Sequence, residues 1–284
     1  MRSRISEAVR RRGGLSHISR LEADGISPDR VQRAADRGEL TRVRTGWYQV
    51  GTPHPALVSA VRAGGSLTCV SSLRLRGVWT IDDGLLHVRV RRGTGGAPQE
   101  HIRRHWSNRP VVDPIDDVRE AARCAVRCLP LEQAVAALDS AIHLGLVNLQ
   151  DVRRDADPRM LRVTGMVDAR SESGLESLAR VRLRRLRIRA IPQARIPGVG
   201  RVDLLIGDRL LLELDGEEFH DFERDRSRDR RAAVRGYLTI RASYRQVIDE
   251  WAALEDDLLL LIRRREHLDN TARSSHTHRL PHGA

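Results

Sequence analysis

The sequence predicts a mixed α/β (α+β) fold built from several small domains, and three features lead to this prediction. The 284 residues can form two or three small domains, and a hydrophobic content of 40% suffices for real cores. Helical and strand-like periodicities alternate along the chain in three segments, which we place at residues 1–52, 53–165 and 170–265. Residues 266–284 show no apolar period, so we expect a disordered tail there.

The charge of the chain favours a polyanionic partner. The formal net charge is +12 at pH 7, and all 50 basic residues are arginine because the sequence contains no lysine. Arginine forks pair with phosphates, which favours nucleic acid, although a solvated surface that keeps the protein soluble explains the same charge. The lack of lysine excludes a lysine base, a Schiff base and a phosphate-loop lysine.

Hydropathy and cysteine usage indicate a cytoplasmic protein. No apolar stretch approaches the length of a membrane span, and no signal-peptide pattern opens the chain, so we expect no membrane contact. Cys69, Cys124 and Cys128 are too few for a disulfide framework. Cys124 and Cys128 lie in a helical pattern without a second pair at zinc spacing, so we interpret them as packing residues.

The first segment shows three short helical patterns followed by two strands. We expect Ser16 to cap the second helix, and Ser27 to cap a third helix that begins at Pro28 and stops at Gly38. Two strands around a turn should follow, at residues 40–44 and 47–50. This order of elements predicts a winged helix-turn-helix.

Arginines occupy the surface that such a domain turns towards DNA. On the third helix, Val31, Ala34 and Ala35 share one face, and the opposite face is basic. The predicted DNA-binding residues on this helix and on the wing are Arg30, Arg33, Arg37, Arg42 and Arg44. The alternative is a small helical domain whose arginines only coat its surface.

The middle segment offers no catalytic constellation. Strand-like runs at 85–91 and 101–106 flank a glycine-rich loop, and helices surround them. His87, His101 and His105 lie in this region, but no carboxylate pattern supports a metal site around them. We expect an α+β spacer or a surface for a protein partner.

The last segment contains the candidate catalytic residues. Ser171 or Ser173 can cap a helix with Glu176 in its first turn. The following pattern is three strands, a helix, a strand and a helix, at residues 193–197, 201–206, 210–215, 222–234, 237–242 and 246–262. The segment therefore predicts a small αβββαβα core.

Residue parity selects the pairing of the second and third strands. A three-residue loop at 207–209 pairs Leu204 with Leu212 and places Asp203 opposite Glu213. One face then becomes apolar, while the other gathers Asp203, Glu213 and Asp215. Carboxylates that face each other repel unless a cation lies between them, and hard oxygen ligands suit Mg²⁺ or Mn²⁺. Ion pairs with nearby arginines are the alternative explanation.

The segment GRVDLLIGDRLLLELDGEEFH resembles the very-short-patch-repair endonuclease-like domains of the PD-(D/E)XK nuclease superfamily. Asp203, Glu213, Asp215 and His220 match that motif, and Glu176 in SGLES resembles the acid on its leading helix. The resemblance implies a restriction-endonuclease-like core whose metal ligands are Asp203, Glu213 and Asp215. It also implies a Mg²⁺-dependent or Mn²⁺-dependent hydrolysis of DNA phosphodiesters.

The chain departs from the superfamily motif at its lysine position, where it has Asp215. Arginine cannot accept a proton in place of lysine, so Asp215 becomes a further ligand and His220 a candidate to orient or deprotonate water. An acid at this position is usual in the very-short-patch-repair group.

The first segment resembles the winged-helix domain of type IV, abortive-infection-type antitoxins. The resemblance rests on Gly38, Leu40, Arg42, Arg44, Gly46 and Tyr48. Three hypotheses follow: a DNA endonuclease, a transcriptional regulator or antitoxin with a catalytically silent nuclease fold, and a toxin–antitoxin partner that acts through protein contacts.

Overall fold

The computed structural model of the protein describes residues 4–95, 99–154, 156–215 and 222–269. Contacts divide the chain into two units, Met1–Leu129 with Val147–Met160 and Pro130–Leu146 with Leu161–Ala284. Both units combine helices with small sheets, which confirms the mixed α+β class. We expected residues 130–146 in the middle domain, but they group with the C-terminal unit. The reason is that α7 (Leu131–His143) packs against α10 (Gly174–Arg185).

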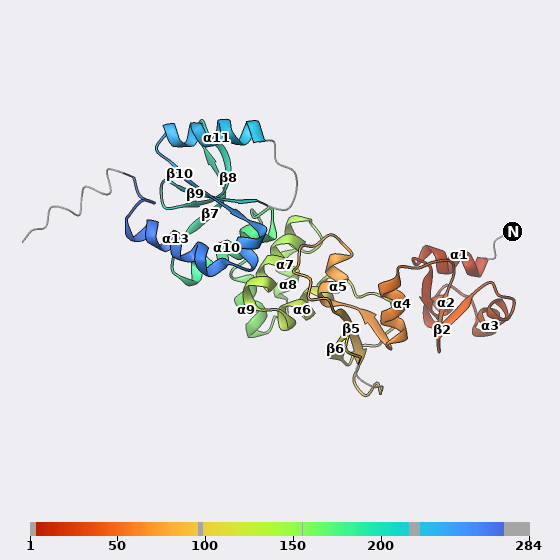
Figure 1. Cartoon of the computed structure of the whole chain (residues 1–284). Helices are drawn as coiled ribbons and strands as arrows, with labels where there is room; N and C mark the ends of the chain where they lie inside the picture. Colours follow the sequence, from red (N-terminus) through yellow and green to blue (C-terminus); the bar gives the residue numbers. More distant parts are fainter. Residues whose placement is uncertain (1–3, 96–98, 155, 216–221, 270–284) are drawn as a thin grey trace, which may run out of the picture. The chain divides into compact units, whose positions relative to one another are not determined.

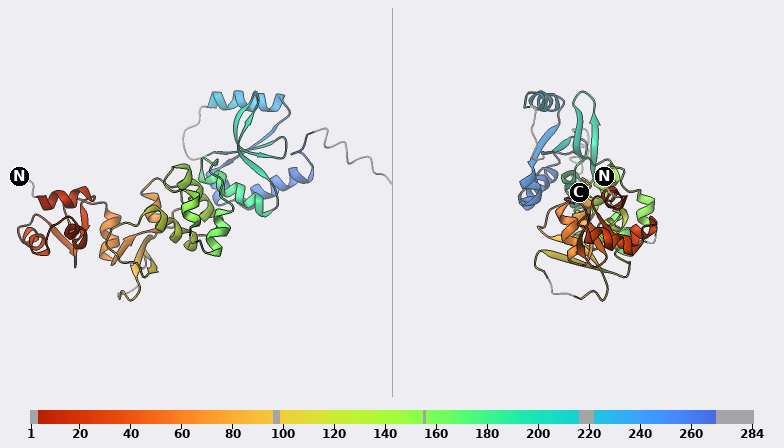
Figure 2. Two further views of the ribbon diagram at one scale, coloured as in Figure 1. Left: turned by 180° about the vertical axis from the view of Figure 1, so that it is seen from behind. Right: turned by 90° about the vertical axis from the view of Figure 1, so that its right-hand side faces the viewer.

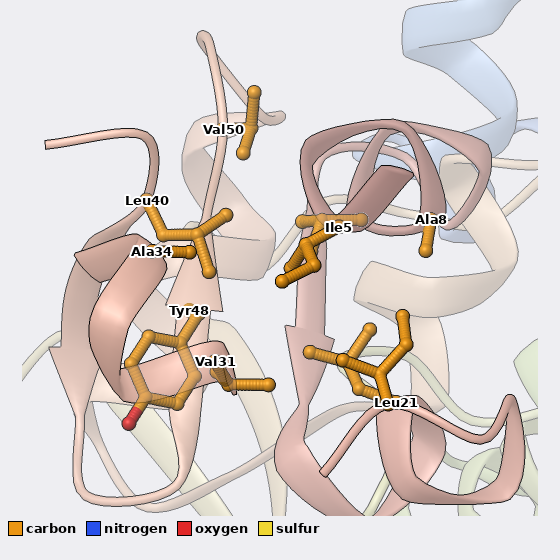
Figure 3. Packing of buried hydrophobic residues seen from close by; sticks show 10 residues of the cluster. Ile5, Ala8, Leu21, Val31, Ala34, Leu40, Tyr48 and Val50 are labelled. Carbon is orange, nitrogen blue, oxygen red and sulfur yellow. The ribbon is translucent and has the colours of Figure 1, made fainter. Parts of the chain in front are cut away.

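The N-terminal part of the first unit consists of three helices and one antiparallel sheet. Its elements are α1 (Arg4–Arg11), β1 (Leu15–His17), α2 (Ile18–Ala23), α3 (Pro28–Asp36), β2 (Thr41–Arg44) and β3 (Trp47–Gln49). Strand β3 lies between β1 and β2. The apolar face of α3 meets the other helices in a buried cluster that contains Ile5, Leu21, Val31 and Tyr48 (Figure 3).

One expected helix start in this part is wrong. Ser16 does not cap α2, because it lies in β1; the N-cap is His17, whose Nδ1 accepts the backbone N–H of Ser19 at 3.2 Å. A strand of three residues is too short to show an alternation, so β1 has no recognisable sequence pattern. The third helix agrees with its prediction, since Ser27 is its N-cap and Gly38 follows its end with a φ of +72°.

The rest of the first unit is built on a second small sheet. Its elements are α4 (Pro55–Arg62), β4 (Gly65–Leu67), α5 (Cys69–Arg74), β5 (Leu86–Arg91), β6 (Ile102–Ser107), α6 (Val118–Cys128), α8 (Leu149–Arg153) and the beginning of α9 (Pro158–Thr164). Strand β5 is central, antiparallel to β4 and parallel to β6. Both predicted strand-like runs are confirmed, and β4 is an additional strand.

The second unit contains a four-stranded sheet in the order β10-β9-β8-β7. The strands are β7 (Ala190–Ile196), β8 (Gly200–Ile206), β9 (Leu210–Asp215) and β10 (Leu238–Ser243), and β9 and β10 are parallel. Helix α11 (Phe222–Val234) lies on one face, and α10 and α13 (Trp251–Arg263) lie on the other (Figures 1 and 2). The short α12 (Tyr244–Ile248) connects β10 to α13.

Several boundaries in this unit differ from expectation, and the single helix predicted at 246–262 is divided into α12 and α13. Strand β7 begins at Ala190, three residues earlier than predicted, and contains Pro192. Proline is tolerated there because β7 is the edge strand, where a missing N–H costs no ladder bond. Residues 266–269, which we assigned to the tail, reach the β8–β9 turn, where His267 O accepts the backbone N–H of Asp208 at 2.8 Å. Residues 270–284 lie outside the described ranges.

Candidate functional site

The leading helix of the second unit buries an acidic side chain beside the sheet. Ser173 is the N-cap of α10, and its side chain accepts the N–H of Glu176 at 3.2 Å. Glu176 is 3% exposed, and its Oε2 accepts the N–H of Glu172 at 3.1 Å and Nε2 of Gln193 at 2.8 Å. Burial raises the pKa of Glu176 above its ordinary value.

The strand register predicted from parity is confirmed for its apolar pairs. Leu204 pairs with Leu212 and Ile206 with Leu210, and all four side chains are buried on one face of the sheet. The β8–β9 ladder ends at the Leu204–Leu212 pair and does not include the predicted Asp203–Glu213 pair. Beyond it, the Asp203 carboxylate accepts the N–H of Leu214 at 2.8 Å. The hairpin therefore opens where the acidic residues lie.

Gln193 connects the helix to this opening. Its Nε2 lies 2.8 Å from Glu176 Oε2 and 3.4 Å from Asp203 Oδ1, so one amide bridges a buried and a half-buried carboxylate. The flanking pairs Pro192–Leu204 and Ala194–Val202 place Gln193 beside Asp203, and its φ of +53° departs from strand geometry. Sequence reasoning missed Gln193, because a glutamine in a strand carries no motif of its own.

Burial and like charge perturb both strand carboxylates. Burial is the main cause that raises the pKa of Asp203, and the N–H of Leu214 opposes it. Burial, with the Asp203 charge as the second cause, raises the pKa of Glu213 to about 7. Two carboxyls with raised pKa values lie next to each other, which is typical of a functional centre but also occurs in structural ion-pair networks.

Arginines contact the acidic face directly. Arg228 on α11 donates from Nη2 to Glu213 Oε1 at 2.6 Å and also to the carbonyl of Arg201. Arg241 on β10 lies 3.6 Å from Asp215 and 3.0 Å from Asp229. The alternative that we left open, in which arginines neutralise the acids, therefore describes this state of the protein.

The predicted ligand set is only partly assembled. Glu176 and Asp203 are joined through Gln193, while Glu213 and Asp215 each contact an arginine. Within the part of the chain that the structure describes, these acids do not form a group of three donors that meet around one point. His220, the candidate water-orienting residue, lies outside the described ranges.

The five arginines predicted to contact DNA are all exposed, namely Arg30, Arg33, Arg37, Arg42 and Arg44. Arg37 pairs with Glu39 at 2.7 Å, and the Arg44 guanidinium fills the space beside Gly64 that a Cβ would occupy. The remaining arginines extend from α3 and β2 into solvent, where phosphates can reach them.

The middle region gives one outcome that we did not expect. Cys69, His87, His105 and Cys128 bring their donor atoms within 4.8 Å of one another. We inferred from sequence that no carboxylate supports these histidines. That inference is wrong, because the Asp83 carboxylate lies 3.0 Å from His87 Nε2. His101 is not in this group.

No family model matches the chain, and no curated protein matches it. None of the helices in the described ranges has both the length and the apolarity that a bilayer crossing requires.

Proposed function

We propose that this protein binds DNA and hydrolyses its phosphodiester bonds in a reaction that depends on Mg²⁺ or Mn²⁺. The proposal assigns a winged helix-turn-helix to residues 1–52, an antitoxin-like α+β domain to 53–165 and a restriction-endonuclease-like core to 170–265. The observation that carries it is the opening of the β8–β9 hairpin, where the half-buried Asp203 and the buried Glu213 both have raised pKa values.

The residues divide into ligands and residues that orient them. Asp203, Glu213 and Asp215 would hold the ion, and Gln193 with the N–H of Leu214 fixes the Asp203 carboxylate. A bound Mg²⁺ would supply polarisation of the phosphate and an activated water. Arg228 would leave Glu213 and neutralise the phosphate charge, since a guanidinium fork fits phosphate as well as carboxylate.

DNA binding is supported by the N-terminal elements. The elements follow the order α1-β1-α2-α3-β2-β3, with β3 between β1 and β2, and this order supports the proposed winged helix. The exposed side of α3 carries Arg30, Arg33 and Arg37, and β2 carries Arg42 and Arg44. Such arginines would position the duplex mainly through phosphates.

A second candidate function is favoured by one specific contact. The 2.6 Å bond from Arg228 neutralises Glu213 without a metal, as expected for a nuclease fold that has become silent. The protein would then be a transcriptional regulator or type IV antitoxin that binds DNA, with a protein partner on the middle domain.

A nicking assay on supercoiled plasmid with Mg²⁺ or Mn²⁺ separates the two. We expect cutting by the wild type, loss of cutting by Asp203→Ala and Glu213→Ala, and unchanged cutting by Asp256→Ala, an exposed acid on α13. Equal cutting by all four proteins would refute the assigned centre. DNA binding without cutting, weakened by Arg33→Ala or Arg42→Ala, would favour the regulator.

A further inference from the structure

Two thiol groups and two imidazole groups lie close together in the first unit, far in sequence from the acidic centre. The inference drawn from them does not depend on the proposed function. We infer that Cys69, His87, His105 and Cys128 bind one Zn²⁺ ion in a tetrahedral Cys₂His₂ site. Their donor atoms, one from each residue, all lie within 4.8 Å of one another. They come from the start of α5, from β5, from β6 and from the end of α6 (Figure 1).

The separations suit a single tetrahedral ion. Zinc lies about 2.3 Å from sulfur and about 2.0 Å from nitrogen, so neighbouring donors are roughly 3.3 to 3.8 Å apart. His87 Nδ1 lies 3.0 Å from His105 Nε2 and 3.9 Å from Cys128 Sγ. Small side-chain rotations would bring both separations to that range. A two-iron cluster needs its ligands in two separate pairs, and the compact arrangement does not provide them.

The Asp83 carboxylate contacts the His87 ring nitrogen that faces away from the cluster and so orients this ligand. His87 is fully buried, and its Nε2 lies 3.0 Å and 3.2 Å from the two oxygens of Asp83. Nε2 must carry the proton to donate to this carboxylate, so Nδ1 presents its lone pair to the cluster. A carboxylate–histidine pair of this kind is the usual second contact of a zinc-bound imidazole.

The backbone at Cys69 has an uncommon conformation, and this conformation also supports a ligand site. Cys69 has a φ of +52° and is fully buried at the first position of α5. The preceding N–H, that of Thr68, donates to His87 O at 2.9 Å and fixes the strand–helix junction beside the cluster. Strained residues of this kind concentrate at ligand-binding sites, where surrounding structure enforces them.

The donor set defines the role of the ion. Two thiolates and two neutral imidazoles balance the charge of Zn²⁺, and four protein ligands leave no open position for substrate. The ion would join the ends of two helices to the parallel pair β5–β6. The site is therefore structural, and its loss should lower stability rather than change the chemistry of the reaction.

Metal content of the full-length protein, produced without a polyhistidine tag, tests the inference. We expect about one zinc per chain by elemental mass spectrometry. Cys69→Ser and His105→Ala should lose most of it, whereas Cys124→Ser and His101→Ala should keep it. These controls are matched, because Cys124 is on the same helix as Cys128 but outside the donor group, and His101 lies next to the start of β6.

A second measurement uses the wild type alone, since ligand variants can fail to fold. Cobalt(II) exchanged into the protein should give thiolate charge-transfer bands and the strong visible bands of tetrahedral cobalt, and chelation should lower the unfolding temperature. If the purified wild type contains no zinc and takes up no cobalt, the inference is wrong. The group would then be only a hydrogen-bonded histidine pair beside two cysteines. A Cys69–Cys128 disulfide in the purified protein, found by mass spectrometry without reductant, would overturn the inference equally.

Discussion

Arg228 Nη2 lies 2.6 Å from Glu213 Oε1, so a guanidinium occupies the carboxylate that the proposed function assigns to a metal ion. Glu213 is 6% exposed, and the two partners come from α11 and β9. A cation at that oxygen would compete with Arg228 for its lone pairs and would be repelled by the guanidinium charge. The contact therefore links metal binding to the position of one helix.

Replacing Arg228 with methionine should strengthen metal binding. Because the arginine no longer competes for Glu213, we expect Mg²⁺ or Mn²⁺ affinity to rise about tenfold, equivalent to about 1.4 kcal/mol. Titration calorimetry on the protein without DNA measures this. Arg231→Met, on the exposed side of the same helix, should leave the affinity unchanged. Equal affinities in all three proteins would mean that Arg228 does not compete with the metal ion for Glu213.

The raised pKa of Glu213 makes a prediction about stability and pH. Its folded-state pKa is about 7, above its ordinary value of 4.5, so the folded protein binds the proton more tightly than the unfolded chain. The free energy of unfolding should thus rise as pH falls from about 7 to 4.5. Ionised Glu213 destabilises the fold above that window, by an amount on the order of 3 kcal/mol.

Glu213→Gln tests this without a change of shape. In buffer without divalent cations, the variant should unfold at a higher temperature than the wild type at pH 8, with the difference shrinking towards pH 5. Asp256→Asn, an exposed acid in the same unit, should show no such trend. A difference that stays constant with pH would contradict the assigned pKa.

A buried ion pair fixes the helix that carries Glu176. Asp139 on α7 accepts bonds from Arg180 Nη2 and Ser177 Oγ, both at 2.7 Å, and from Asp168 N at 2.8 Å. Asp139→Ala should cost about 3–5 kcal/mol, because it leaves the Arg180 charge buried without its partner. Chemical denaturation measures the loss. Glu172→Ala breaks an exposed pair with Arg201 and should cost less than about 1 kcal/mol.

Salt dependence of DNA binding should identify the phosphate contacts. Each phosphate neutralised by an arginine contributes about 0.9 to the slope of log affinity against log salt. Arg33→Ala and Arg42→Ala should each lower that slope by about 1, measured by fluorescence anisotropy on a duplex. Arg12→Ala is the control, since Arg12 is paired with Asp24 at 2.6 Å. Unchanged slopes in the first two variants would remove α3 and β2 from the interface.

Elements whose signals are local could be predicted from the order of residues alone. Alternation of leucines fixed the register of β8 and β9, because a shift by one residue would bury Asp203 among apolar side chains. Local signals likewise placed the starts of α3 and α10: Ser27 with Pro28 marked the first, and Ser173, whose side chain caps the helix, marked the second. The exposed arginines of α3 followed from helical periodicity alone.

Contacts between side chains of distant elements could not be predicted in this way. Gln193 reaches Asp203 and Glu176 across a strand pair and a helix, and Arg228 reaches Glu213 from α11. The Cys/His group joins residues between 69 and 128, with no short spacing that a sequence pattern could reveal. The register of a strand pair depends on the alternation of apolar residues, which neighbouring residues in the sequence already show. A site depends on which separate elements pack together, and that is decided by burial of their apolar faces.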